Sequence, residues 1–302
     1  QVEFGGHLRV MSLVATDDGV ATQTREIKND VFRKAKTQTP DAIAVEDQGE
    51  QGKISPELLA KLQAHPLVQS KGFVSHPHIQ SLNFTRKAFF DGKWDDVNVM
   101  ARGLFVADDR RIVARSYPKF FNLEERAETQ TPNLQNALHF PLRLWVKENG
   151  YLGILGWDHI GGDLFYASKS TPESDFAGWF REIFEAEAGE RGVDRAREML
   201  NKRNLSLVFE VNDPKRDPHM IAYETPHVVL LDAMRREEAF VRVAYEELKQ
   251  IAGMLGVAVK QPGPTFRAWK DFHGWLDAVK RDGRGYQWKN QHIEGFVAED
   301  HS

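Results

Sequence analysis

From residue 100 onwards, the sequence alternates short apolar segments of strand length with polar or glycine-containing turns. Residues 103–106 and 112–117 flank a polar turn, and this arrangement predicts a β-hairpin. Residues 151–157 and 164–168 flank a turn that contains two glycines, which predicts a second hairpin. Hairpins interleaved with helices, without a regular βαβ repeat, predict an α+β fold in which helices flank antiparallel sheets.

Further elements are predicted by apolar periodicity and by residues that favour helix ends. Ser55 and Ser174 are typical helix N-caps, Pro56 suits a first helical turn, and Gly256 suits a helix C-terminus. The other expected strands are residues 10–14, 142–147, 205–211, 228–233 and 292–298, and the expected helices are residues 55–62, 174–184, 193–204, 237–255 and 265–279.

The start of the chain differs from the rest. Apart from residues 10–14, residues 1–54 are polar with weak periodicity, so we expect an N-terminal segment that is a linker or the tail of a preceding domain. Residues 55–302 are then expected to form one domain. Because the chain begins with Gln1 and not with Met, we expect a piece of a longer protein or a processed form.

Composition excludes several classes of protein. The 302 residues are 41% hydrophobic, which is enough for a globular core, and no apolar segment reaches the roughly 18–20 residues of a membrane span. Cysteine is absent, which excludes disulfides, thiolate zinc sites and a cysteine nucleophile and favours a cytoplasmic location. A net charge of −4 argues against a protein that coats polyanions, although local basic clusters can still bind nucleic acid.

Lys147 ends a predicted strand and precedes Gly150, where the backbone can approach a ligand closely. A lysine amine is a nucleophile only when it is neutral, and its ordinary pKa is about 10.4. Burial beside Trp145 or Tyr151, or nearby cations, would favour the neutral form. A lone K-x-x-G stretch is a weak signal, and by itself it favours a solvated turn lysine.

Four further residues could complete a site around this lysine. Lys169 ends a hairpin strand, and if the hairpin closes at residues 158–163, both lysines lie at the same end of one sheet. Two cations held together suit a triphosphate, although an edge-strand lysine also discourages aggregation. Glu210 and Glu294 lie inside apolar segments, where carboxylates either face solvent or hold Mg²⁺ through water. Phe209 could stack on a base, but core packing is the better interpretation of this residue alone.

The sequence gives only weak evidence for other kinds of catalytic or metal site. His76 and His78 could ligate a metal, but no partner has a matching spacing, so we interpret them as loop residues. The sequence contains no G-x-x-x-x-G-K-[ST], no G-x-S-x-G and no H-E-x-x-H stretch. These absences argue against a P-loop nucleoside triphosphatase.

In their order along the chain, these stretches resemble the motifs of covalent nucleotidyltransferases. K-E-N-G at 147–150 resembles motif I, S-K-S at 168–170 resembles motif Ia, and F-E at 209–210 resembles motif III. V-V-L-L-D at 228–232 resembles motif IIIa, and E-G-F-V at 294–297 resembles motif IV. Upstream, A-R-G-L-F at 101–105 and K-F-F-N-L at 119–123 are more specific. They resemble the RNA ligase 1 family of phage and the ligase domain of fungal tRNA ligases. The resemblance covers about residues 80–298 and implies the nucleotidyltransferase fold of ligase adenylation domains.

The resemblance implies an ATP-dependent RNA ligase. Lys147 would attack the α-phosphate of ATP and carry AMP, the AMP would pass to an RNA 5′-phosphate, and a 3′-OH would displace it. The expected partners are RNA ends, including tRNA halves, with fused or associated end-healing kinase and phosphatase domains and no membrane. Phe209 would stack near adenine, and Glu210 and Glu294 would organise Mg²⁺ or Mn²⁺ through water. The whole expected nucleotide-binding set is Arg102, Lys119, Trp145, Val146, Glu148, Asn149, Gly150, Lys169, Phe209, Glu210 and Glu294.

Two departures from the family pattern leave alternatives open. Asn149 stands where many of these ligases have Asp, a form that resembles the fungal tRNA ligases. The sequence stops at Ser302, before the K-x-K lysine pair of motif V, so we expect a truncated domain that performs the first step poorly. One alternative is a related nucleotidyltransferase that acts on DNA ends or on caps. Another is a non-catalytic RNA-binding remnant.

Overall fold

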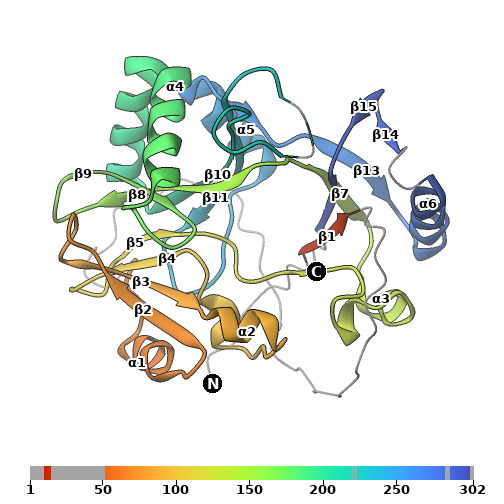
Figure 1. The fold of residues 1–302 in the computed structure, drawn as a ribbon, viewed down its shortest axis with the longest axis horizontal. Coiled ribbons are helices and arrows are strands. Elements are labelled where there is room, and N and C mark those ends of the chain that lie inside the picture. Colours follow the sequence, from red (N-terminus) through yellow and green to blue (C-terminus); the bar gives the residue numbers. More distant parts are fainter. Residues whose placement is uncertain (1–9, 15–51, 220, 222, 283–285, 300–302) are drawn as a thin grey trace. The chain divides into compact units, whose positions relative to one another are not determined.

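The computed structural model describes residues 10–14, for which only the backbone is considered, and residues 52–219, 221, 223–282 and 286–299. The chain divides into two compact units, each built from segments that are distant in the sequence (Figure 1). Unit 1 comprises residues 1–40, 120–149 and 260–302, and unit 2 comprises residues 41–119 and 150–259. No helix in the described part of the chain has the length and apolarity of a membrane span.

Unit 1 is built on a five-stranded sheet with the strand order β13-β7-β16-β1-β6. β7 pairs antiparallel with β13 and β16, and β16 pairs antiparallel with β1. Leu142, Leu144 and Val146 alternate along β7, and they pack with Phe272 and Leu276 of helix α6. The elements of unit 1 are β1 Val10–Val14, β6 Phe121–Asn122, η2 Ala127–Thr129, α3 Thr131–Ala137, β7 Leu142–Lys147, β13 Pro262–Phe266, α6 Trp269–Asp282, β14 Gln287–Trp288, β15 Gln291–His292 and β16 Gly295–Glu299.

Unit 2 contains a five-stranded sheet, β12-β11-β10-β8-β9, and a four-stranded sheet, β2-β3-β4-β5. Helices α4 and α5 cover one face of the larger sheet, where Phe180, Phe184 and Phe209 form the centre of an apolar core. The elements of unit 2 are α1 Pro56–Ala64, β2 Val68–Gly72, β3 Ile79–Phe84, α2 Arg86–Phe90, η1 Asn98–Met100, β4 Leu104–Ala107, β5 Ile112–Arg115, β8 Tyr151–Asp158, β9 Asp163–Ser168, α4 Asp175–Lys202, β10 Leu205–Asn212, β11 His227–Arg235, α5 Tyr245–Leu255 and β12 Ala258–Val259.

The two sheets of unit 2 pack against each other through a second apolar core. Phe105 and Val113 of the smaller sheet contact Ile154 and Phe165 of the larger one. A glycine makes this close packing possible, because a Cβ atom on Gly156 would lie 2.2 Å from the carbonyl oxygen of Val113. The larger sheet is therefore covered on one face by helices and on the other by the smaller sheet.

The predicted α+β class and both predicted hairpins are confirmed, but the ends of several elements were misplaced. The helix expected from residue 237 begins at Tyr245, because an antiparallel bridge between Met234 and Arg242 keeps the preceding segment extended. The helix expected from residue 265 begins at Trp269, because residues 262–266 form strand β13. The helices expected at 174–184 and 193–204 form one element, α4, with a break at Gly189, where φ is 63°.

A further difference concerns the predicted site. The last strand begins at Gly295, so Glu294 lies in a bend before the strand and not within it. The strand predicted at residues 10–14 is confirmed, since β1 pairs with β16 in the sheet of unit 1. The remainder of residues 1–51 lies outside the described residues.

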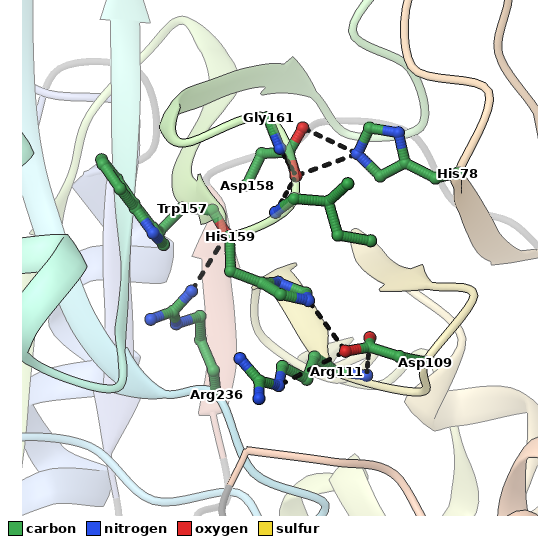
Figure 2. A network of polar contacts seen from close by, with 9 residues as sticks. His78, Asp109, Arg111, Trp157, Asp158, His159, Gly161 and Arg236 are labelled. Atoms are coloured by element: carbon green, nitrogen blue, oxygen red, sulfur yellow. Dashed lines mark hydrogen bonds and ion pairs between the residues drawn. The ribbon is translucent and has the colours of Figure 1, made fainter.

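A network of polar contacts ties the β8–β9 turn to the smaller sheet of unit 2 (Figure 2). The Asp158 carboxylate accepts hydrogen bonds from the backbone N–H groups of Ile160 and Gly161, both at 3.0 Å. It also contacts Nε2 of His78 at 2.8 Å, and the neighbouring His159 contacts Asp109 at 2.9 Å. His78 lies in the loop before β3, which confirms its interpretation as a loop residue.

We expect Asp158→Ala to lower the free energy of unfolding by about 1–3 kcal/mol, because three donors lose the buried carboxylate that accepts their hydrogen bonds. Burial alone would raise the pKa of Asp158, but hydrogen bonds from Gly161 and His78 outweigh it and hold this pKa below its ordinary value. The stabilisation is therefore complete above the ordinary pKa of about 3.9 and is lost as pH falls through the lower folded value. Urea unfolding at several pH values measures both effects.

The matched control is Lys202→Ala, which removes an exposed ion pair with Glu198 on helix α4. Exposed pairs of this kind contribute about 0–1 kcal/mol. If Asp158→Ala and Lys202→Ala shift the urea midpoint equally, the network does not stabilise the turn.

Candidate active site

The amine of Lys147 is held by a carboxylate within unit 1. Lys147 is the last residue of β7 and pairs in register with Gly295, the first residue of β16. This register brings the preceding residue, Glu294, to the lysine, and Nζ forms an ion pair with Glu294 Oε1. The other carboxylate oxygen accepts a hydrogen bond from Asn149 Nδ2 at 2.9 Å. The exposed fractions are 25% for the Lys147 side chain and 14% for that of Glu294, so the ion pair is mostly shielded from water.

Trp145 lies on the same face of β7 as Lys147, two residues earlier, and is 3% exposed. Lys260 Nζ lies 4.3 Å from the centre of its ring and 3.0 Å from Glu299 Oε1. Lys260 and Glu299 are themselves buried. Trp145 therefore packs on a buried ion pair and offers little surface to a nucleotide.

In unit 2, the Glu210 carboxylate binds the backbone of Gly150, the residue that follows the K-E-N stretch. Its Oε1 accepts a hydrogen bond from the backbone N–H of Gly150 at 2.9 Å. Only glycine fits at this position, because a Cβ atom would lie 2.2 Å from the carbonyl oxygen of Val211 and 2.7 Å from Asn212 Oδ1. The glycine of the K-x-x-G stretch is thus required by close contact with strand β10.

Three cations expected from the sequence gather in unit 2. Burial lowers the pKa of Arg102 to about 10, and the negative charge of Glu210 partly opposes this shift. The pKa of Lys169 is lowered by loss of water around its amine and further by the positive charges of Arg102 and Lys119. Because like charges held together repel one another, a cluster of this kind suits a polyanionic ligand such as a triphosphate.

Two aromatic rings hold these lysines in place. Lys169 Nζ lies 5.2 Å from the ring centre of Phe84, and Lys119 Nζ lies 5.4 Å from that of Trp94. The two rings meet edge to face with centres 4.8 Å apart. The sequence reasoning missed both aromatic residues, and no spacing rule could have found them, because each contact joins segments that are far apart in the chain.

Comparison with known proteins identifies the family. A family model described as RNA ligase matches residues 100–302, which is about two thirds of the chain. This chain belongs to the RNA ligase family. The family expected from the sequence motifs is therefore confirmed.

Two curated relatives of this RNA ligase chain are yeast tRNA ligases. The tRNA ligase of Candida albicans is 28% identical over 148 residues, which cover 41% of this chain and 18% of the relative. The tRNA ligase 1 of Schizosaccharomyces pombe is 27% identical over 221 residues, which cover 67% of this chain and 27% of the relative. The chain thus spans about a fifth to a quarter of the length of these relatives.

Solved structures support the predicted fold. An archaeal ATP-dependent RNA ligase, in two forms, matches with a TM-score of 0.52 and 14% sequence identity. The match covers 84% of this chain and 60% of that chain. At this identity the likeness concerns the fold, and it agrees with the nucleotidyltransferase fold expected for an RNA ligase.

Some expected site residues do not fit the roles given to them. Phe209 is completely buried and packs on Phe180 and Phe184, so it does not stack on adenine. Val146 points its side chain into the core of unit 1, which leaves only its backbone for a ligand. Lys147 and Lys169 do not lie at the same end of one sheet, because β7 and β9 belong to different sheets. Glu148 is half-buried.

The metal expectation rests on two carboxylates that belong to different units, Glu210 and Glu294. Both oxygens of Glu294 already bind protein groups, and one oxygen of Glu210 binds Gly150. Among the described residues, no three His, Cys, Asp or Glu side chains form a cluster suited to a metal ion. The residues fit Mg²⁺ only if most of its ligands are waters and substrate phosphates, which is the usual way this ion binds.

We expect Gly150→Ala to lower the free energy of unfolding by about 1–3 kcal/mol, because the added methyl group collides with strand β10. Gly178 of helix α4 is the matched control, since a Cβ atom there meets no atom within 4 Å. Gly178→Ala should be neutral or stabilise the fold by up to about 1 kcal/mol. Urea unfolding of both variants makes the comparison, and equal stabilities would contradict the tight contact at Gly150.

Proposed function

We propose that this chain is the adenylyl-transferring domain of an ATP-dependent RNA ligase and that Lys147 carries the AMP. The observation that carries the proposal is the placement of the Lys147 amine at the end of β7, oriented by Glu294, in a chain of the RNA ligase family. The fold match to an ATP-dependent RNA ligase supports the choice of nucleotide.

In the first step, the neutral amine of Lys147 attacks the α-phosphorus of ATP. A P–N bond forms, the P–O bond to pyrophosphate breaks, and the amine loses a proton. In the second step, an RNA 5′-phosphate oxygen takes the AMP, so the P–N bond breaks and a P–O bond forms. In the third, a 3′-OH attacks the activated 5′-phosphate and AMP leaves. The ion pair with Glu294 gives Lys147 one orientation, which lowers the entropic cost of attack. Before the attack the ammonium group must give up a proton, and the Glu294 carboxylate is the neighbouring group that can accept it.

Arg102, Lys119 and Lys169 are proposed to bind the phosphates, and Glu210 to contact the ribose while it holds Gly150. Positive groups fixed where charge develops on phosphate oxygens stabilise the transition state. Gly150 is three residues from Lys147, so their Cα atoms can be no more than about 11 Å apart. The residue that Glu210 holds is therefore always close to the nucleophile.

Mg²⁺ or Mn²⁺, when bound, would neutralise phosphate charge, with Glu210 and Glu294 contacting the metal through water. The proposed acceptor is RNA with 5′-phosphate and 3′-OH ends, including tRNA halves, because the curated relatives are tRNA ligases. End-healing kinase and phosphatase domains are proposed as fused or separate partners. A cytoplasmic location is proposed from the cysteine-free composition.

We expect Lys147→Ala to abolish covalent labelling of the protein by ATP that is radiolabelled at the α-phosphate. The amine is the only group in this proposal that bonds to phosphorus, so no slower route remains. Lys202→Ala, an exposed lysine on helix α4, should label like the unaltered chain. Labelling of Lys147→Ala, or no labelling of the unaltered chain in Mg²⁺ or Mn²⁺, would contradict the proposal.

We expect Lys169→Ala to raise the Michaelis constant for ATP in the labelling reaction by about tenfold or more, since a charge-assisted bond to phosphate is lost. The lowered pKa of Lys169 means that its positive charge is present at low pH and is lost as pH rises through that value. ATP binding should therefore weaken with rising pH in the unaltered chain and less so in the variant. Lys249→Ala, at an exposed position of helix α5, is the control. An unchanged Michaelis constant in Lys169→Ala would exclude this role.

A further inference from the structure

Residues 84–94 of unit 2, here called the aromatic loop, begin and end with two rings that contact the lysines proposed to bind ATP. Phe84 and Trp94 meet at the base, under Lys169 and Lys119 respectively. Helix α2 forms the tip and is anchored by the buried Ala88. The carbonyl oxygen of Ala88 accepts a hydrogen bond from the Lys93 N–H at 3.0 Å, which returns the chain to the base.

The tip exposes two aromatic rings that the proposed adenylylation does not use. Phe89 is 54% exposed and Phe90 is 79% exposed. Their ring centres are 5.6 Å apart and the rings meet edge to face. Neighbouring exposed aromatic side chains are unfavourable in water, and a cluster of them usually marks a binding surface.

Basic residues flank these rings in the sequence of the loop. Arg86 is exposed, and the side chains of Lys87 and Lys93 are 67% and 61% exposed. The one acid within the loop, Asp91, lies 2.7 Å from Lys87 Nζ and 3.4 Å from Lys93 Nζ. Ion pairs in water are weak, so both lysines can exchange Asp91 for a phosphate group. The following acid, Asp95, is engaged by His65 and by backbone N–H groups.

We propose that the tip of the aromatic loop binds an unpaired segment of the substrate RNA. Bases would stack on Phe89 and Phe90, and backbone phosphates would contact Lys87, Lys93 and Arg86. Aromatic rings with interleaved cations are the usual platform for single strands, because every unpaired base offers a face for stacking. A duplex has no such free faces. The proposal rests on the proposed function, from which it takes RNA as the substrate.

The loop gives this surface a role in the reaction. Its base and its tip are joined by only a few residues, so RNA held at the tip stays near the lysines that are proposed to bind ATP. This arrangement would raise the local concentration of RNA at the adenylylated enzyme. The surface therefore serves the later steps and not the formation of lysyl-AMP.

The test compares the double variant Phe89→Ala/Phe90→Ala with Ile160→Ala, which removes an apolar side chain that is 53% exposed at the β8–β9 turn. Binding of a 5′-phosphorylated single-stranded RNA to the full chain is measured by fluorescence anisotropy at several salt concentrations. We expect the double variant to bind about tenfold or more weakly with an unchanged salt dependence, and to form lysyl-AMP normally. Lys87→Ala/Lys93→Ala should instead make the plot of log association constant against log salt concentration less steep by about 1.4, because two phosphate contacts are lost.

Unchanged RNA binding by Phe89→Ala/Phe90→Ala would overturn the proposal. It would also be overturned if the rings proved to be covered by a second copy of the chain, seen as a concentration-dependent dimer that the double variant abolishes while RNA binding persists. Failure of the proposed function looks different, because the unaltered chain would then form no lysyl-AMP. Loss of RNA binding in the double variant would support the surface even in that case.

Discussion

The site depends on two hydrogen bonds made by consecutive residues at the point where the chain leaves unit 1 and enters unit 2. Asn149 donates to Glu294 in unit 1, and the N–H of Gly150 donates to Glu210 in unit 2. Each unit therefore fixes one side of the same peptide bond through an acid of its own. Lys147 lies two residues before Asn149, and its amine pairs with the same acid, Glu294, that accepts the hydrogen bond from Asn149.

These bonds give the two acids a different role from the one that their sequence context suggests. Acids within apolar strands are typical metal ligands or solvent-facing residues, and both readings miss the hydrogen bonds to the K-E-N-G stretch. Glu294 contacts both the Lys147 amine and the Asn149 amide. An asparagine suits this position because its amide donates a hydrogen bond to Glu294, whereas the Asp found there in many of these ligases would repel the Glu294 carboxylate. Glu210 in turn requires a glycine, because only glycine brings its N–H this close to β10.

Local patterns predicted the fold better than they predicted the environment of single side chains. Alternation located β7, β8 and β10, and caps located α1 and the end of α5, because those signals act within a few residues. Burial of charged residues depends on distant partners and could not be foreseen. Arg115 and Arg236, for example, are buried and donate to backbone carbonyls of distant segments. The order of the motifs identified Lys147, whereas the rings beneath Lys119 and Lys169 became visible only in the folded chain.

The lysine proposed as the nucleophile and the lysines proposed to bind phosphate have different partners. Lys147 is paired with a carboxylate, which orients its amine and opposes its charge. Lys119 and Lys169 rest on aromatic rings, and a ring attracts a cation without neutralising it. The repulsion among Lys119, Lys169 and Arg102 would fall if a polyanion bound, which is the electrostatic reason for proposing that this cluster binds phosphate. Phe84 and Trp94 thus position the lysines that are proposed to bind phosphate. The same loop presents two exposed rings at its tip, Phe89 and Phe90.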